Sequence, residues 1–185
     1  PQGQEQFLQQ VRESGTSVVL VLSGGSPIAF PEDIADAILF IWYPGEEGGN
    51  AVADVLFGDA VPSGKLPLTF PKSIDNLPPY EDYAMQGRTY RYATQEPLFP
   101  FGFGLSYTRF SYDSITFSSE TIQKGESLDV DVTVTNTGNR VAEEVVQLYL
   151  TDLEASVDVP LHALKGFCRV SLNAGETKVV KFNVT

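Results

Sequence analysis

Two adjacent carboxylates, Glu46 and Glu47, are the residues of this sequence with the types best suited to acid/base chemistry. They follow a strand-like apolar run at residues 37–42, and open α/β sheets bind ligands beyond the carboxyl ends of their strands. Neighbouring side chains on a helix diverge, however, so the two cannot jointly flank one bond. Acidic residues in the first turn of a helix also stabilise its dipole. We favour this structural role and predict no catalytic residue in the chain.

The loop Ser23-Gly24-Gly25-Ser26-Pro27 follows an earlier apolar run at residues 17–22. Taken alone, it could cradle a phosphate. It lacks the lysine of a P-loop and the glycine spacing of a dinucleotide fingerprint. The segment Phe101-Gly102-Phe103-Gly104 fails the same test, because Tyr107 occupies the third glycine position. We therefore favour structural loops and expect no nucleotide or other cofactor.

Three side chains are candidates for contact with a sugar: Trp42, Arg88 and Tyr90. An aromatic ring suits the CH-rich face of a pyranose, although Trp42 also closes an apolar strand, which favours the core. Arg88 and Tyr90 lie in a run of alternating basic and aromatic residues. They could reach a substrate pocket or clamp this segment onto another domain, and clamping is favoured. Trp42, Arg88 and Tyr90 are predicted as the candidate substrate-binding residues.

The chain has one cysteine, Cys168, and one histidine, His162. A disulfide framework and a zinc site built from these residue types are therefore excluded. A lone cysteine in a strand-like run is more often a buried thiol than a reactive one. We expect no metal centre and assign no role to His162.

The formal net charge of −12 over 185 residues constrains the partners. An acidic surface repels phosphate backbones, so nucleic acid is not expected, whereas neutral ligands such as sugars are compatible with it. No apolar run reaches the roughly 18 residues of a membrane span, so no membrane is expected either. The sequence opens at Pro1 without a methionine or a basic leader. This suggests that the natural N-terminus lies upstream, and the compartment stays unknown.

Residues 1–73 are predicted to be part of an α/β domain. A helix is expected over 4–14, ending at Gly15, and a second over 50–57, ending at Gly58. The runs at 17–22 and 37–42 are apolar on both faces, which is typical of parallel strands covered by helices. Two strands make too small a sheet to stand alone. We therefore expect the rest of the sheet to come from sequence outside these residues.

Residues 74–110 form a linker rich in proline and aromatic residues, and residues 111–185 read as β structure. The linker is too apolar to be free, so we expect it to be ordered and packed. Apolar and polar residues alternate in the last part, and turn signals separate the runs. Five strands are predicted, near 113–118, 127–135, 144–151, 163–172 and 176–185. A fibronectin-like sandwich has about seven strands, so this domain is expected to be incomplete.

Several long motifs resemble those of family 3 glycoside hydrolases. WYPGEEGGNAVADVLFGDAVPSGKLPLTFPKS (42–73), LPPYEDY (77–83), GRTYRY (87–92) and PLFPFGFGLSYTRFSY (97–112) are similar to the second catalytic domain. VTVTNTGNRVAEEVVQLYL (132–150) is similar to the fibronectin type III-like domain that ends many members. The resemblance implies an open α/β sandwich domain, incomplete here, joined by the ordered linker to a fibronectin type III-like β-sandwich.

The resemblance also implies a retaining, exo-acting β-glucosidase or, second, β-xylosidase. Its substrate would be a β-linked oligosaccharide or aryl glycoside with a terminal non-reducing residue. Retention requires two carboxyl groups about 5 Å apart. In this family these are an aspartate of a barrel domain and a glutamate that would lie upstream of Pro1, so both fall outside the chain. We expect the 185 residues alone to be inactive, and the barrel and the rest of the α/β domain to be their partners.

Two other interpretations remain open at this point. The full-length protein could be a non-catalytic carbohydrate-binding or scaffold module, or the chain could be an unrelated small α/β protein with a β tail. A glutamate-bearing loop upstream would separate the enzyme from the module. Homo-oligomer formation is possible under each of them. The chain is not expected to fold independently, because apolar strand faces at both ends would be left uncovered.

Overall fold

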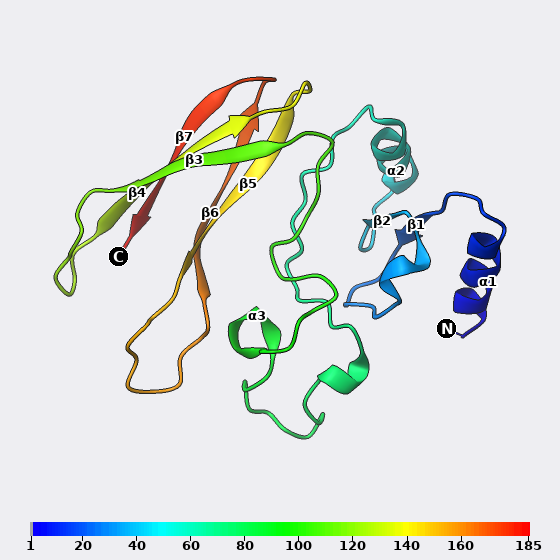
Figure 1. Cartoon of the computed structure of the whole chain (residues 1–185), viewed down its shortest axis with the longest axis horizontal. Helices are drawn as coiled ribbons and strands as arrows, with labels where there is room; N and C mark the ends of the chain where they lie inside the picture. The colour runs from blue at the N-terminus through cyan, green and yellow to red at the C-terminus, as the bar shows by residue number, and fades with distance from the viewer. Residues whose placement is uncertain (1) are drawn as a thin grey trace.

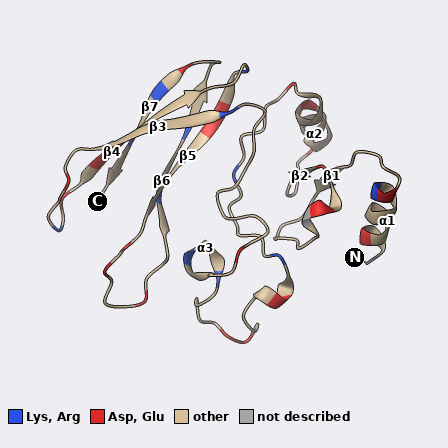
Figure 2. Ribbon diagram, viewed as in Figure 1, with Lys and Arg blue, Asp and Glu red and all other residues tan. Residues whose placement is uncertain are grey.

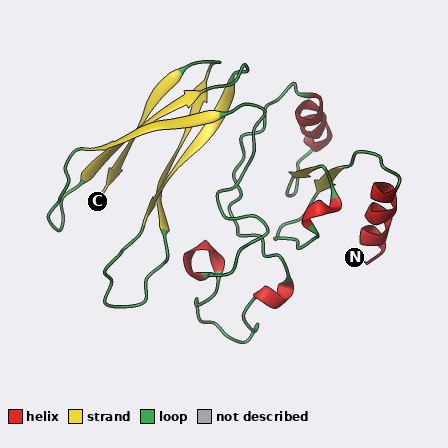
Figure 3. Cartoon of the chain, in the orientation of Figure 1, coloured by secondary structure: helices red, strands yellow, loops and turns green. Residues whose placement is uncertain are grey.

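The computed structural model describes residues 2–185, with an α/β part and a β part joined by a long connection (Figures 1 and 3). In chain order the elements are α1 (Gln2–Glu13), β1 (Val19–Leu22), η1 (Glu32–Ile34), β2 (Ala37–Phe40), α2 (Gly48–Phe57), η2 (Ile74–Asn76), α3 (Thr89–Tyr92), β3 (Phe110–Phe117), β4 (Leu128–Asn136), β5 (Ala142–Leu150), β6 (Ala163–Leu172) and β7 (Thr177–Val184). The predicted helices and all five predicted strands of the β part are confirmed, with ends shifted by a few residues. None of the helices in this described part is long and apolar enough to cross a bilayer.

The α/β part contains the two predicted parallel strands. β1 and β2 pair in register from Val19 with Ala37 to Leu22 with Phe40. Gly58 ends α2 in the left-handed conformation at a φ of 83°, which glycine adopts without steric cost. Val19 and Val21 are exposed on β1, so one side of this small sheet is uncovered within residues 2–185.

Asp36 ties the start of β1 to α1. Its carboxylate accepts a hydrogen bond from the backbone N–H of Val18 at 2.7 Å and lies 3.5 Å from the Arg12 guanidinium. The backbone hydrogen bond, followed by the positive charge of Arg12, holds the pKa of Asp36 below its usual value. The helix and the strand are thus joined by an exposed ion pair, which contributes little stability by itself.

The connection between the two parts is ordered, as predicted. Its later portion pairs with residues 66–70: the Phe70 N–H donates to Phe99 O at 2.9 Å, and the Leu66 N–H donates to Phe103 O at 2.8 Å. Phe70 is 2% exposed and packs edge-on against Phe40 of β2 and Phe99. Burial of these rings holds the connection against the α/β layer.

The burial predicted for the aromatic rings of the connection is not uniform. The rings of residues 90, 92, 99, 101 and 103 are at least partly buried, whereas Tyr80 and Tyr83 are each 87% exposed. Contacts within residues 2–185 therefore account for the burial of the later rings but do not bury Tyr80 and Tyr83.

The β part is a sandwich of two antiparallel sheets, ordered β3-β4-β7 and β5-β6 (Figure 3). Its core combines the inward-facing residues of four strands: Val130, Val132, Val134, Val146, Leu148, Leu172 and Val180. Cys168 packs at the margin of this core as a free thiol and is only partly buried, although a buried thiol was favoured. Alternation with period two placed the apolar residues on the inner faces.

Strand β3 has an inner face that the second sheet does not cover. Tyr112, Ile115 and Phe117 pair with the core residues Val134, Val132 and Val130 of β4. Each of the three is nevertheless more than half exposed, at 54%, 52% and 55%. The two strands of the second sheet cover β4 and β7 but leave β3 open. That two further strands complete the sandwich stays a prediction.

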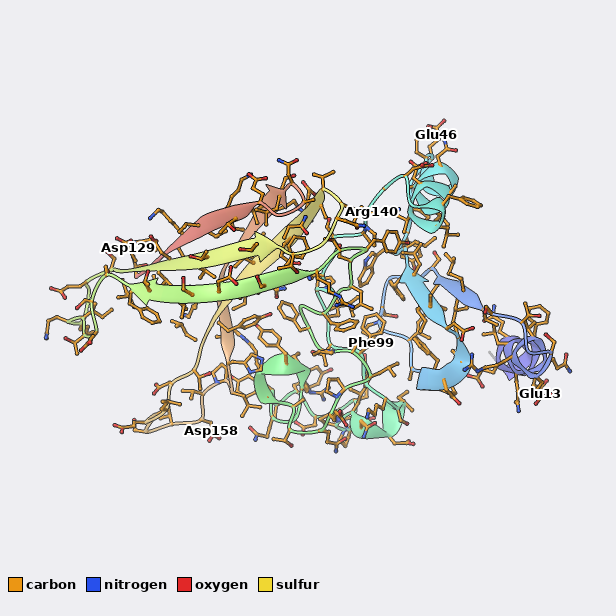
Figure 4. All side chains as sticks on the ribbon, turned by 45° about the horizontal axis from the view of Figure 1, so that its top comes forward. Glu13, Glu46, Phe99, Asp129, Arg140 and Asp158 are labelled. Carbon is orange, nitrogen blue, oxygen red and sulfur yellow. The ribbon has the colours of Figure 1, made fainter. Side chains whose placement is uncertain are left out.

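The contacts that join the two parts start from one short stretch, residues 55–65. The Tyr107 hydroxyl donates to Val55 O at 2.7 Å, and the Arg140 guanidinium donates to Gly58 O at 3.2 Å. Arg169 donates to the Ser63 hydroxyl at 2.6 Å. Figure 4 shows Arg140 between the sandwich and α2. This stretch is the seam along which the α/β part meets the sandwich.

Candidate functional site

The carboxyl ends of β1 and β2 bring two loops together, at the edge where open α/β sheets bind ligands. The carbonyl oxygen of Trp42 accepts hydrogen bonds from the Ser23 hydroxyl at 2.6 Å and from the Gly24 N–H at 3.1 Å. Trp42 has a φ of 54°, in the left-handed region that a bulky residue rarely adopts. Such a conformation costs about 1–3 kcal/mol and persists only where its surroundings fix it. The two hydrogen bonds provide that fixation.

The side chains of Trp42 and Tyr43 point in different directions from this strand end. The Trp42 ring is partly buried and packs edge-on against Phe40, with ring centroids 4.6 Å apart. The Tyr43 ring is 79% exposed and lies over Gly25, where an added Cβ would come within 2.7 Å of it. The glycine of the first loop therefore makes room for the tyrosine of the second.

Glu46 and Glu47 lie just before α2, as the sequence predicted. Both are exposed, and the Glu47 carboxylate accepts a hydrogen bond from the Asn50 side chain at 2.5 Å. Figure 4 shows Glu46 at the outer end of α2, pointing into solvent. The position is that of acidic residues which stabilise a helix N-terminus.

Arg88 binds the backbone of the loop that precedes it. Its guanidinium donates to the carbonyl oxygens of Ala84 and Pro79, both at 3.0 Å, and to that of Asp82. One cation thus binds three carbonyl groups of the turn, and that of Pro79 also accepts from the Asp82 N–H at 3.1 Å. These contacts fix the loop itself, so clamping onto another domain stays a prediction, as does substrate contact.

Tyr90 belongs to an aromatic cluster that joins α3 to the sandwich. Its ring stacks on Phe101 at 4.2 Å and lies 5.2 Å from the His162 ring and 6.0 Å from the Tyr149 ring. Its hydroxyl accepts a hydrogen bond from the Leu164 N–H at 3.2 Å. His162, to which no role was assigned, is thus part of this cluster.

Trp42, Arg88 and Tyr90 do not converge on one pocket within the described chain. The contacts of Trp42 lie in the β1–β2 layer, those of Arg88 in residues 79–84, and those of Tyr90 at the sandwich. Substrate contact by each of them stays a prediction.

A charged cluster that the sequence analysis missed lies where residues 64–65 meet the sandwich. The Lys65 ammonium is 3.0 Å from the Glu144 carboxylate and donates to Gly104 O at 3.0 Å. The two charged side chains are only 19% and 8% exposed. The sequence held one signal: Glu144 shares the inner face of β5 with Ala142 and Val146, where an apolar residue is expected.

An open groove of about 1420 Å³ runs beside this cluster. Its lining includes Tyr112, Glu144 and Gln147 from the two sheets and residues 100–110 of the connection. Partial burial, although 54% of the residue is exposed, followed by the neighbouring Glu144 carboxylate, raises the pKa of Tyr112 to about 12. The groove follows the edge of β5 that does not pair with β6.

The raised pKa of Tyr112 predicts a loss of stability at high pH. A free tyrosine ionises at about pH 10. The pKa of Tyr112 is therefore higher in the folded protein than in the unfolded chain, and ionisation favours the unfolded chain. The contribution of un-ionised Tyr112 to the free energy of unfolding is present below about pH 10. It is lost as the pH rises through about 12. The free energy of unfolding should fall more steeply over this interval in the parent protein than in Tyr112→Phe. Superimposable curves would contradict the prediction, and Tyr43→Phe, on an exposed ring, is the control.

Comparison with known proteins settles the family. Residues 1–107 match the glycosyl hydrolase family 3 C-terminal domain, and residues 144–185 match the fibronectin type III-like domain. The chain belongs to glycoside hydrolase family 3. The family and the fold class expected from the motifs are therefore confirmed.

Relatives of both expected kinds cover the whole chain. A periplasmic β-glucosidase of Salmonella typhimurium is 44% identical over 198 residues, which span 100% of this chain and 26% of that protein. A xylan 1,4-β-xylosidase of Xylanibacter ruminicola is 46% identical over 187 residues, spanning 100% of this chain and 21% of that protein. The chain thus represents about a quarter of the length of these family 3 relatives.

Solved structures agree with the family assignment. β-Glucosidase 3B from Thermotoga neapolitana, in complex with glycerol, aligns with a TM-score of 0.87 at 35% identity, over 98% of this chain and 28% of that one. A β-glucosidase from Listeria innocua in complex with isofagomine aligns with a TM-score of 0.85 at 37% identity, over 100% of this chain and 28% of that one. The arrangement of the α/β part and the sandwich is thus that of family 3 β-glucosidases.

Proposed function

We propose that the full-length protein containing this chain is a retaining, exo-acting β-glycosidase that removes terminal non-reducing β-D-glucosyl or β-D-xylosyl residues. The observation that carries the proposal is the match of the whole chain to a β-glucosidase and a β-xylosidase at 44% and 46% identity. Two such similar values do not separate glucose from xylose. We place glucose first, because the aligned solved structures quoted above are β-glucosidases.

The chemistry of retention requires a nucleophile and an acid/base about 5 Å apart across the scissile bond. Glu46 and Glu47 are both exposed just before α2, Figure 4 shows Glu46 pointing into solvent, and the two do not form such a pair. We propose that the aspartate nucleophile and the glutamate acid/base both lie outside residues 1–185. The chain would then supply structure and substrate positioning.

We propose three units: residues 1–73 as part of an α/β sandwich domain, 74–110 as linker and 111–185 as part of a fibronectin-like domain. Uncovered strand faces support the incompleteness of the first and the third. Val19 and Val21 of β1, and Tyr112, Ile115 and Phe117 of β3, expose apolar surface that isolated domains bury. We propose that further strands of the same polypeptide cover both.

Hydrolysis of aryl β-glucosides and β-xylosides tests the proposal. The full-length protein should release the aryl group from at least one of them with retention, which the anomer of the first-formed sugar reveals. The purified 185-residue chain should show no turnover above background. A full-length protein that binds sugars without hydrolysing them would support a non-catalytic module instead.

Substitutions of Trp42 and Tyr90 in the full-length enzyme separate substrate contact from packing. Trp42→Ala should raise KM for an aryl glycoside if the ring meets the sugar. Tyr90→Phe should leave kcat and KM unchanged and lower the free energy of unfolding by about 1 kcal/mol, because it removes the acceptor of the Leu164 N–H. A rise in KM for Tyr90→Phe without a loss of stability would assign the hydroxyl to the substrate.

A further inference from the structure

Residues 74–85 carry apolar side chains that residues 2–185 leave half to largely exposed. Ile74, Leu77, Tyr80, Tyr83 and Met85 are all exposed, and the two tyrosines reach 87%. We call these five residues the loop face; they lie along η2 and the turn that follows it, in the lower part of Figure 1. Single exposed apolar residues are ordinary. Five within one short segment, with tyrosine and methionine among them, have the composition of an interface.

The conformation of this segment is fixed from within. Arg88 donates to the carbonyl oxygens of Pro79 and Ala84 at 3.0 Å, and the Asp82 carboxylate accepts from the Ala84 N–H at 2.8 Å. The chain therefore turns sharply around the guanidinium, and the exposed rings project from a turn that is already ordered. A preordered turn loses less conformational entropy when it binds.

The charge around the loop face narrows the choice of partner. Asp75, Glu81 and Asp82 lie among its residues, and no lysine or arginine occurs between 74 and 85, while the Arg88 guanidinium at the turn is taken up by backbone carbonyl oxygens. Figure 2 shows this acidic character on η2 and the following turn. A complementary surface would have an apolar centre and a neutral or basic rim.

We infer that the loop face docks against a part of the same polypeptide that lies outside residues 1–185. The chain spans only 26% and 21% of two relatives that it matches throughout, and a full-length protein of similar length would hold most of its residues outside this chain. A tethered partner is present at high effective concentration. The aliphatic residues Ile74 and Leu77 favour a protein surface, since a sugar ring requires only a flat aromatic face.

Tyrosine nitration of the native full-length enzyme, read by mass spectrometry, tests the docking directly. Nitration requires the undocked state, whose population falls tenfold for every 1.4 kcal/mol of docking free energy. Tyr80 and Tyr83 should react about tenfold or more slowly in the native enzyme than in the same enzyme unfolded in urea. Equal rates in the two states would overturn the inference.

A double variant, Tyr80→Ser with Tyr83→Ser, distinguishes a protein surface from a sugar site. Docking predicts that Tm of the full-length enzyme falls by about 2 °C or more while KM is unchanged. An unchanged Tm with a raised KM would assign the rings to substrate and refute the docking. Leu153→Ser is the matched control, because Leu153 is 88% exposed on the loop between β5 and β6.

The inference rests on membership in a longer family 3 protein and not on hydrolysis. A full-length protein that proves inactive on β-glycosides would refute the proposed function. The nitration rates would still test the docking of the loop face.

Discussion

Replacing Asn136 with alanine should lower the free energy of unfolding by about 3 kcal/mol or more, because four buried or partly buried groups would lose their partner at once. The side chain is fully buried at the end of β4. Its amide donates to Arg140 O at 2.7 Å and to Leu172 O at 3.0 Å. Its oxygen accepts from the Thr108 hydroxyl at 2.7 Å and from the Gly138 N–H at 3.1 Å.

Urea unfolding of the full-length protein measures this loss. Asn139→Ala is the matched control, since Asn139 lies exposed in the same turn and its replacement should change stability by less than about 0.5 kcal/mol. Similar losses for the two variants would show that the four hydrogen bonds of Asn136 contribute nothing beyond the turn itself.

Replacing Lys65 with methionine should cost about 3–5 kcal/mol, because the Glu144 carboxylate would be left buried without its counter-ion. The two groups are 3.0 Å apart, and the Glu144 side chain is only 8% exposed. Loss of the hydrogen bond to Gly104 O adds to the effect. The change should appear in the midpoint of urea unfolding.

A double-mutant cycle separates the energetic cost of the unpaired Glu144 carboxylate from that of the lost side-chain packing. Adding Glu144→Leu to Lys65→Met should recover most of the stability, since replacing both partners of a buried ion pair with apolar residues is often neutral or better. Additive losses in the double variant would contradict this account. They would show that each side chain acts through its own packing rather than through the pair.

The backbone of both parts was predictable because its signals are local. Period-two alternation located β4 and β5, continuous apolar runs located β1 and β2, and Gly58 marked the end of α2. The predicted second strand was two residues too long. Trp42 adopts a left-handed conformation that no property of a tryptophan signals, so β2 ends at Phe40.

The contacts between the parts were not predictable, because they join residues far apart in sequence. Asn136 directly follows the predicted strand at 127–135, and nothing local indicates that its side chain binds four groups from three segments. Glu144 broke the apolar pattern of β5, but nothing local indicated Lys65 as its partner. The exposure of Tyr80 and Tyr83 likewise depends on sequence beyond residues 1–185.

The narrow seam at residues 55–65 has a consequence for recombining family 3 enzymes. In a chimera with its crossover just after residue 65, residues 1–65 come from one parent and the rest from another. Lys65 and Glu144 would then come from different parents, and so would Ser63 and Arg169. The hydrogen bonds to the backbone oxygens of Val55 and Gly58 use no side chain of the α/β part and would survive such a change where the other parent also has glycine at position 58. A crossover placed just before residue 63 would instead transfer both side-chain pairs together from one parent.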